Sequence, residues 1–262
     1  MNRRSFLPFL SGGISRSFLL GTLGGGAAGA AGASAAVAGI NAKQPWAHSS
    51  HSQQGEDLII ESICRSLKIE SPTYLDIGAA DPIVENNTYL FYEKGSHGVL
   101  VEPNPVFGRK LEAQRPRDIV LNVGVGYNDL RDSDYFMVSG RDGAYLNTFS
   151  KEEAEIIVSK SRGQRSIEKV IKLPLVNINA IIENHFPKAP DFVSIDTEGL
   201  DLEILKSLDF DRYRPAVLCV ETLILGTMRV KTEILELMKA KGYSIRGGTF
   251  VNTIFVDNSL IV

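Results

Sequence analysis

Short apolar runs alternate with helical patterns from residue 55 to the end of this 262-residue chain, and this alternation constrains the fold more than any other feature. Short β-rich runs separated by helical segments are typical of parallel strands joined by crossover helices. Two of the runs, VLVE and AVLCVE, are apolar nearly throughout, which indicates strands covered on both faces. The sequence therefore predicts an α/β fold, a doubly wound sandwich of three layers around a mostly parallel, twisted sheet.

Local signals place the individual elements. The spacing of apolar residues predicts one helix over residues 56–67 and another over 232–242, which Gly242 ends. Five apolar runs are the expected parallel strands, at residues 73–79, 97–103, 118–125, 190–199 and 214–222. A hairpin formed by residues 244–256 is expected to close the sheet in antiparallel fashion.

The body of the chain, residues 55–262, is expected to form one domain. Its least regular stretch, residues 127–175, is interpreted as an insertion. Within this insertion we expect a hairpin between residues 135–140 and 144–149, followed by a helix over 151–161.

The N-terminal segment, residues 1–42, differs in composition from the body. It contains three arginines, no acidic residue and 9 of the 24 glycines. The opening NRRSFLPFL resembles the core of a twin-arginine export signal, with Arg3 and Arg4 paired and Pro8 in place of the usual lysine. Glycines interrupt the tract that follows, so a permanent membrane span is not favoured. We expect an exported or membrane-anchored protein that engages the export machinery; the alternative is a disordered tail on a cytoplasmic protein. Residues 43–54 are expected to be a polar linker.

The charge balance and the cysteine count exclude several classes of site. Lys and Arg number 28 and Asp and Glu number 31, a net charge of −3, so no basic excess points to nucleic acid as a partner. The two cysteines, Cys64 and Cys219, cannot build a disulfide scaffold or a four-cysteine zinc site. We expect both in the core.

Acidic or amide side chains follow every expected parallel strand. In open α/β sheets, ligands bind outside the carboxyl ends of the strands. Those ends carry Asp76 to Asp81, Glu102, Asn122, Asp196 with Glu198, and Glu221, and they carry no Lys or Arg. Such a rim repels phosphates, and the first turn lacks the G-x-G-x-x-G pattern of dinucleotide sites. The rim suits a nucleoside with positive charge and no phosphate, and S-adenosylmethionine has this chemistry in its sulfonium, its ammonium and its ribose diol.

Glu102 and Gly78 are the residues expected to matter most for such a nucleoside. Glu102 follows Asp76 by 26 residues, at the end of the next strand, where a carboxylate can accept hydrogen bonds from both ribose hydroxyls. Gly78 lets the backbone approach the ligand because it has no Cβ. Simpler interpretations stay open: Gly78 as an ordinary turn, Glu102 as a solvated strand end and Asp196 as a helix cap. On these residues alone, another Rossmann-like binder is an equal alternative.

Several motifs in combination resemble one family. The order S-Q-x-x-E-D, D-I-G-A, E-P-N-P and D-x-E-G, followed by PAVLCVE and KGYS, is similar to the FkbM-type family of S-adenosylmethionine-dependent methyltransferases over about residues 52–256. The resemblance implies a Rossmann-like methyltransferase fold and O-methylation of a small-molecule or glycan acceptor, on a hydroxyl of a sugar, glycan or polyketide-type product. Two features depart from the family: His97 stands where an aromatic is commoner, and an export signal is unexpected for an enzyme whose cofactor is kept in the cytoplasm.

The resemblance also implies roles for individual residues. The cofactor-binding set would be Asp76, Gly78 and Ala79 in the loop, Asn87 and Thr88 at the methionine end, Glu102 at the ribose, and Asn122 and Val123 beside the adenine. Asp196 would be the base or the acceptor-positioning group of methyl transfer, with Glu198 as its partner. Mg²⁺ held by these two carboxylates is a less favoured alternative, since no third acid clearly converges on them. His185 is expected at a helix end. The alternative function is an exported, non-catalytic binding protein of Rossmann-like fold.

Overall fold

The computed structural model describes residues 48–140, 143–224 and 227–261. The expected signal segment, residues 1–42, lies outside these ranges, as do the first five residues of the expected linker. Among the described residues, no helix has the length and apolar character needed to cross a membrane.

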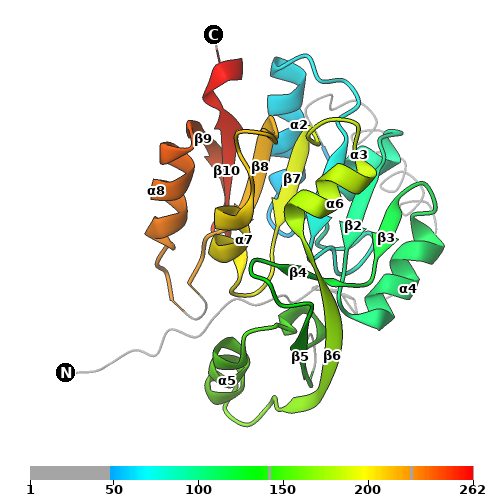
Figure 1. Cartoon of the computed structure of the whole chain (residues 1–262), viewed down its shortest axis with the longest axis vertical. Helices are drawn as coiled ribbons and strands as arrows, with labels where there is room; N and C mark the ends of the chain where they lie inside the picture. Colours follow the sequence, from blue (N-terminus) through cyan, green and yellow to red (C-terminus); the bar gives the residue numbers. More distant parts are fainter. Residues whose placement is uncertain (1–47, 141–142, 225–226, 262) are drawn as a thin grey trace, which may run out of the picture. The chain divides into compact units, whose positions relative to one another are not determined.

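The main sheet has seven strands in the order β3-β2-β1-β7-β8-β10-β9 (Figure 1). Its strands are β1 (Tyr74–Ile77), β2 (Gly98–Val101), β3 (Ile119–Leu121), β7 (Phe192–Ile195), β8 (Val217–Glu221), β9 (Tyr243–Gly248) and β10 (Asn252–Asp257). Five neighbouring strands of this sheet, β3, β2, β1, β7 and β8, are parallel. β10 pairs antiparallel with both β8 and β9. The predicted α/β sandwich with a mostly parallel sheet and a closing antiparallel hairpin is confirmed.

Two hydrophobic clusters, one on each face of the sheet, form the core. The helices are α2 (Glu56–Ser66), α3 (Tyr89–Glu93), α4 (Pro105–Gln114), α5 (Lys151–Lys160), α6 (Ile178–His185), α7 (Asp201–Ser207) and α8 (Thr232–Ala240). Because side chains alternate along a strand, Leu75 and Ile77 pack with residues of α6, α7 and α8, whereas Tyr74 packs with residues of α2, α3 and α4. Both cysteines, Cys64 and Cys219, are buried in the cluster that contains Tyr74. We call this the second hydrophobic cluster, and the one that contains Leu75 and Ile77 the first.

The third apolar run, expected as one strand over residues 118–125, is divided in the structure. Its first part is β3, and its second part is β4 (Gly124–Gly126), which leaves the main sheet and joins a smaller one. A Cβ at Gly124 would lie 2.4 Å from the ring of Phe149, so only glycine lets this segment approach the insertion so closely. The prediction of a single strand was therefore wrong.

The hairpin expected between residues 135–140 and 144–149 is also wrong. β5 (Asp132–Val138) pairs instead with β6 (Ile167–Asn177), and the small sheet has the order β4-β6-β5. A single antiparallel bridge, Phe136 to Thr148, joins β5 to the second expected strand. The eleven-residue β6 offers β5 a much longer ladder than the short segment could. Figure 1 shows β5, β6 and the predicted helix α5 grouped together beside the main sheet.

Candidate active site

A cleft lies at the carboxyl ends of β1, β2 and β7. The chain runs outward from β1 to β2 and β3 on one side and from β7 to β8 on the other, so β1 and β7 mark the switch point of the sheet. The sheet side of the cleft is lined by Gly78, Ala80, Glu102, Pro103, Asp196, Thr197 and Glu198. The insertion lines the other side with Tyr135, Ala144, Tyr145, Asn147 and Phe149. Of the acidic strand ends predicted from the sequence, Glu102, Asp196 and Glu198 therefore meet at one cleft, whereas Asp76, Asp81 and Glu221 do not line it.

Gly78 brings the loop after β1 into contact with the end of β7. Its φ is +86°, and a Cβ built on it would lie 1.8 Å from the carbonyl oxygen of Asp196. The backbone amide of Asp196 in turn donates to the carbonyl of Ile77 at 3.0 Å. Both the left-handed backbone and the close approach require glycine, and Gly78 itself lines the cleft.

Glu102 is buried at the end of β2, where backbone amides hold its carboxylate. Oε2 accepts from the amide of Ala80 at 2.8 Å, and Oε1 accepts from the amide of Asn104 at 2.7 Å. Asn104 caps α4 through Val106, with Pro105 as the first helical residue, which explains the spacing of E-P-N-P. Burial raises the pKa of Glu102 to about 7. Each carboxylate oxygen has a second lone pair, so the group can accept further hydrogen bonds from the cleft.

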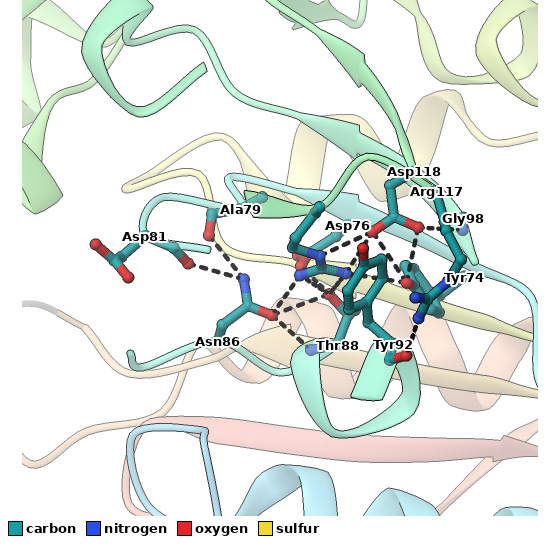
Figure 2. A network of polar contacts seen from close by, with 11 residues as sticks. Tyr74, Asp76, Ala79, Asp81, Asn86, Thr88, Tyr92, Gly98, Arg117 and Asp118 are labelled. Carbon is teal, nitrogen blue, oxygen red and sulfur yellow. Dashed lines mark hydrogen bonds and ion pairs between the residues drawn. The ribbon is translucent and has the colours of Figure 1, made fainter. Parts of the chain in front are cut away.

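Four other residues of the expected cofactor-binding set lie behind the cleft lining. The hydroxyl of Thr88 donates to Oδ2 of Asp76 at 2.7 Å, and both side chains are buried (Figure 2). Ala79 is buried too, and its amide faces the carbonyl of Val101. The amide group of Asn87 donates to Oγ of Ser194 at 3.1 Å. These side chains support the loop after β1 from within the protein.

Asn122 and Val123 lie beside the end of β2 and do not line the cleft. Nδ2 of Asn122 donates to the carbonyl oxygens of Glu102 and Pro103, at 2.6 and 3.1 Å. Val123 packs against the first hydrophobic cluster, and Val125 is the residue of this segment that reaches the cleft.

Asp196 and Glu198 are half-buried and lie close to the buried carboxyls of Asp201 and Glu221. β7 ends at Ile195, and Glu198 has a φ of +52°, so the strand does not continue between the two carboxyls. Burial, with Asp201 nearby, raises the pKa of Asp196 to about 7. Burial and the neighbouring carboxylate of Glu221 raise the pKa of Glu198 well above its usual range.

Lys231 supplies positive charge to this acidic group. Its ammonium lies 3.0 Å from Asp201 and 3.3 Å from Glu221. Glu221 was predicted as an acidic strand end without a role, and neither Asp201 nor Lys231 was predicted from the sequence. Asp201 completes the pattern D-x-E-G-x-D, a usable signal, whereas Lys231 lies in the segment before α8 and carries no motif.

Asn147 places a buried amide group in the wall of the cleft, close to Tyr135. Its Oδ1 accepts from the amide of Val138 at 2.8 Å, but its buried Nδ2 has no partner among the described residues. Tyr135 lines the same wall, and its pKa is raised by burial and by the negative charge of Glu102 and Glu198. Buried donors in proteins are nearly always hydrogen-bonded, and a ligand oxygen in the cleft would accept from Nδ2.

Neither His185 nor a metal cluster adds to the site. His185 is the last residue of α6, as predicted, and does not line the cleft. Within the described ranges, no three His, Cys, Asp or Glu side chains are arranged to hold a metal ion.

Comparison with known proteins gives one family match. The family described as "Methyltransferase FkbM domain" matches residues 76–245. No curated protein sequence gave a significant match.

Three solved structures illustrate the structural likeness. An O-methyltransferase from Bacillus cereus, in complex with SAH, is 13% identical over 85% of this chain and 88% of that chain, with a TM-score of 0.41. A TehB-like SAM-dependent methyltransferase from Corynebacterium glutamicum is 10% identical over 87% and 98%, with a TM-score of 0.41. A magnesium protoporphyrin IX methyltransferase from Synechocystis, with bound SAM, is 10% identical over 78% and 80%, with a TM-score of 0.39.

Proposed function

This chain belongs to the FkbM methyltransferase family and is an S-adenosylmethionine-dependent methyltransferase, and we propose that it methylates a hydroxyl group of a sugar, glycan or polyketide-type acceptor in the cleft at the switch point. S-adenosylmethionine supplies the methyl group, and the chain's own residues bind and align the two substrates. The family assignment favours this enzyme over a non-catalytic binding protein.

The charge of the cleft lining is the observation that carries the proposal. The lining includes the carboxyls of Glu102, Asp196 and Glu198, and no Lys or Arg among the described residues. A sulfonium and an ammonium gain from nearby carboxylates, whereas a pyrophosphate would be repelled. The residues present therefore fit S-adenosylmethionine and do not fit a dinucleotide.

Glu102 is proposed to bind the ribose. Two backbone amides fix its carboxylate at the end of β2, so its orientation is set before a ligand arrives. Hydrogen bonds to a charged acceptor contribute roughly 1.5–3 kcal/mol each, which makes this group a major anchor. Gly78 would allow the ligand close to the backbone of the neighbouring loop.

Three other residues of the expected cofactor-binding set, Asn122, Val123 and Asn87, are proposed to support the cofactor site without contacting the cofactor. Asn122 supports the cofactor region by holding the backbone of Glu102 and Pro103. Val123 shapes the same edge through packing. Asn87 ties the segment before α3 to β7 through Ser194.

Asp196 and Glu198 are proposed to serve methyl transfer itself. A carboxyl with a pKa of about 7 suits a base that accepts a proton from a hydroxyl near neutral pH, a contribution of roughly 10²–10⁴-fold. Glu198, with its pKa raised further, is the partner that can share the proton and orient the acceptor hydroxyl. Alignment of the acceptor oxygen with the donor carbon supplies much of the remaining acceleration.

The acceptor is proposed to lie against the insertion. Tyr145 and Phe149 offer aromatic surface, and Nδ2 of Asn147 offers a donor for an acceptor or cofactor oxygen. The absence of Lys and Arg from the described lining argues against a phosphorylated acceptor.

A labelling assay tests the proposed function. The whole chain would be incubated with methyl-labelled S-adenosylmethionine and a panel of neutral hydroxylated acceptors, namely monosaccharides, glycans and polyketide-type alcohols. We expect label in an ether methyl group of one acceptor class. Transfer only to nitrogen or carbon nucleophiles would overturn the proposed O-methylation while leaving a methyltransferase.

Export through the twin-arginine pathway is a separate proposal, based on the opening motif alone. Replacing Arg3 and Arg4 by lysine should retain the protein in the cytoplasm, whereas the unchanged chain should be recovered outside it. Equal distribution of the two proteins after cell fractionation would refute the signal.

A further inference from the structure

Arg115, the residue after α4, is fully buried and contacts the segment between β1 and α3. Nε donates to Asp118 at 2.8 Å, and Nη2 lies 2.8 Å from the same carboxylate. Nη1 donates to Oδ1 of Asn86 and to Oγ1 of Thr88, each at 3.0 Å, and Nη2 donates to the hydroxyl of Tyr74 at 3.0 Å. We refer to Tyr74, Asp76, Asn86, Thr88, Arg115 and Asp118 as the Arg115 network. Figure 2 labels its other members, with Asn86 beside Ala79 and Asp81 of the loop after β1 and with Tyr74 and Asp118 at the opposite end.

One branch of the Arg115 network reaches Glu102. Because Oδ1 of Asn86 accepts from Arg115 and from the amide of Thr88, the Nδ2 of Asn86 is directed to the carbonyls of Ala79 and Asp81, at 3.0 and 3.1 Å. The residue between those carbonyls, Ala80, donates its amide to the carboxylate of Glu102. A continuous set of hydrogen bonds therefore runs from Arg115 to Glu102.

The same branch holds a conformation that the loop would not prefer alone. Ala80 has a φ of +48°, in the left-handed region that a residue with a Cβ enters only at a cost. Residues in such conformations persist when the surrounding structure fixes them. Here two carbonyl contacts from Asn86 and the amide contact to Glu102 fix Ala80 from both sides.

A second branch reaches β1. Thr88 accepts from Arg115 and donates to Asp76, which lies two residues before Gly78. The guanidinium of Arg115 thus donates both to Asn86, which holds the loop after β1, and to Thr88, which holds β1 through Asp76. Only a planar group with several fixed donors can make all these bonds at once. Lysine keeps the charge but is a single point donor.

We infer that Arg115 is a positioning residue for S-adenosylmethionine: it holds the loop of residues 78–81, through Asn86 and Thr88, in the conformation that presents Glu102 to the ribose. This inference rests on the proposed role of Glu102 in binding the ribose. It adds a residue, Arg115, that acts on the cofactor site without contacting the cofactor. Because S-adenosylmethionine and its demethylated product share the ribose that Glu102 is proposed to bind, the affinities of both should depend on Arg115 equally.

Two variants test the inference in the whole chain. Arg115→Lys keeps a positive charge beside Asp118 but removes the fork. Asn86→Asp keeps an acceptor for Arg115 but places carboxylate oxygen against the carbonyls of Ala79 and Asp81, so it breaks the loop contact alone. We expect each to weaken the binding of both ligands about tenfold or more in calorimetry, since buried carbonyls lose their donors. Hydrogen exchange at the amide of Ala80 should become faster in both variants.

A matched control separates positioning from general stability. Arg214 makes a two-bond fork with Asp257, at 2.7 and 3.0 Å, in a more exposed position outside the cleft lining. Arg214→Lys should lower the Tm but leave ligand affinity and Ala80 exchange as in the wild type, when all proteins are measured well below their Tm values. A merely structural role would move only the Tm.

Each outcome decides one claim. If folded Arg115→Lys and Asn86→Asp bind S-adenosylmethionine as tightly as the wild type does, the inference is overturned. The proposed function then still stands, because the wild type binds the cofactor. If Arg115→Lys does not fold, Asn86→Asp alone decides, because it retains the Arg115 contact. A wild-type chain that binds neither ligand overturns the proposed function and this inference with it.

Discussion

Replacing Gly78 by alanine should disturb the protein in two additive ways. An alanine at a φ of +86° costs roughly 1–2 kcal/mol for the left-handed backbone. The new Cβ would lie 1.8 Å from the carbonyl oxygen of Asp196, and the neighbour is backbone that cannot swing aside. Forced displacement of this kind costs typically about 1–3 kcal/mol. The expected loss in the free energy of unfolding is therefore about 2–5 kcal/mol, together with a displaced cleft wall.

Gly163 offers a matched control for the backbone cost alone. Its φ is +81°, and a Cβ there would meet nothing within 4 Å. Gly163→Ala should therefore lose only the first contribution, about 1–2 kcal/mol. Urea unfolding of the two variants and the wild type measures the difference, and calorimetry with S-adenosylmethionine should show weaker binding for Gly78→Ala only. Equal losses of stability would refute the claim that the loop after β1 packs directly on the end of β7.

Three further predictions concern the buried carboxyls. Asp196→Asn should keep its affinity for S-adenosylmethionine but lose roughly 10²–10⁴-fold in turnover of any identified acceptor; unchanged turnover would remove Asp196 from the reaction. Binding of S-adenosylmethionine near neutral pH should release protons and tighten as pH rises through about 7, because the ribose hydroxyls favour the ionised form of Glu102, whose pKa is raised to about 7; calorimetry in buffers of different ionisation enthalpy measures the release, and proton uptake would contradict it. Without ligand, the raised pKa values mean that the folded chain binds more protons than the unfolded chain, so the free energy of unfolding should fall as pH rises from about 4 through about 7; urea titrations should show a flatter fall in Asp196→Asn, and an identical fall would argue against burial of this carboxyl.

The acidic cleft could be predicted from the sequence because its parts are local. A short apolar run that ends in an acid places that acid at the carboxyl edge of a parallel sheet, whatever the details of packing. This rule brought Glu102, Asp196 and Glu198 to one cleft. It also identified Gly78, whose surroundings require glycine on both conformational and steric grounds.

The finer roles depend on tertiary contacts that no local pattern encodes. Asp76 and Thr88 satisfy each other inside the protein, and nothing in D-I-G-A shows on which face of β1 that acid lies. Asn122 turns to the backbone of Glu102, which is distant in sequence. Lys231 and Asn147 reach the site from irregular segments, so their proximity could be found only from the structure.

The predicted hairpin within the insertion was wrong because strand pairing, too, depends on tertiary contacts. Two neighbouring segments were predicted to pair because short connections usually join paired strands. In the structure, β5 pairs with the longer strand β6 instead. The run IEKVIKLPLVN contains Pro174 and two lysines, which made it a weak strand candidate. Its pairing on both edges joins β4 and β5, the strands that carry Val125 and Tyr135 of the cleft lining.

Calorimetric titration of Glu102→Ala with S-adenosylmethionine tests the central claim most directly. Two hydrogen bonds to a charged acceptor are worth about 3–6 kcal/mol, so the variant should bind more than about a hundredfold more weakly than the wild type. Glu112→Ala, which removes an exposed carboxylate from nearby α4, is the matched control and should bind as the wild type does. We expect micromolar binding by the wild type and the control, and lost binding by Glu102→Ala with its fold intact. Equal affinity of Glu102→Ala and the wild type would contradict it.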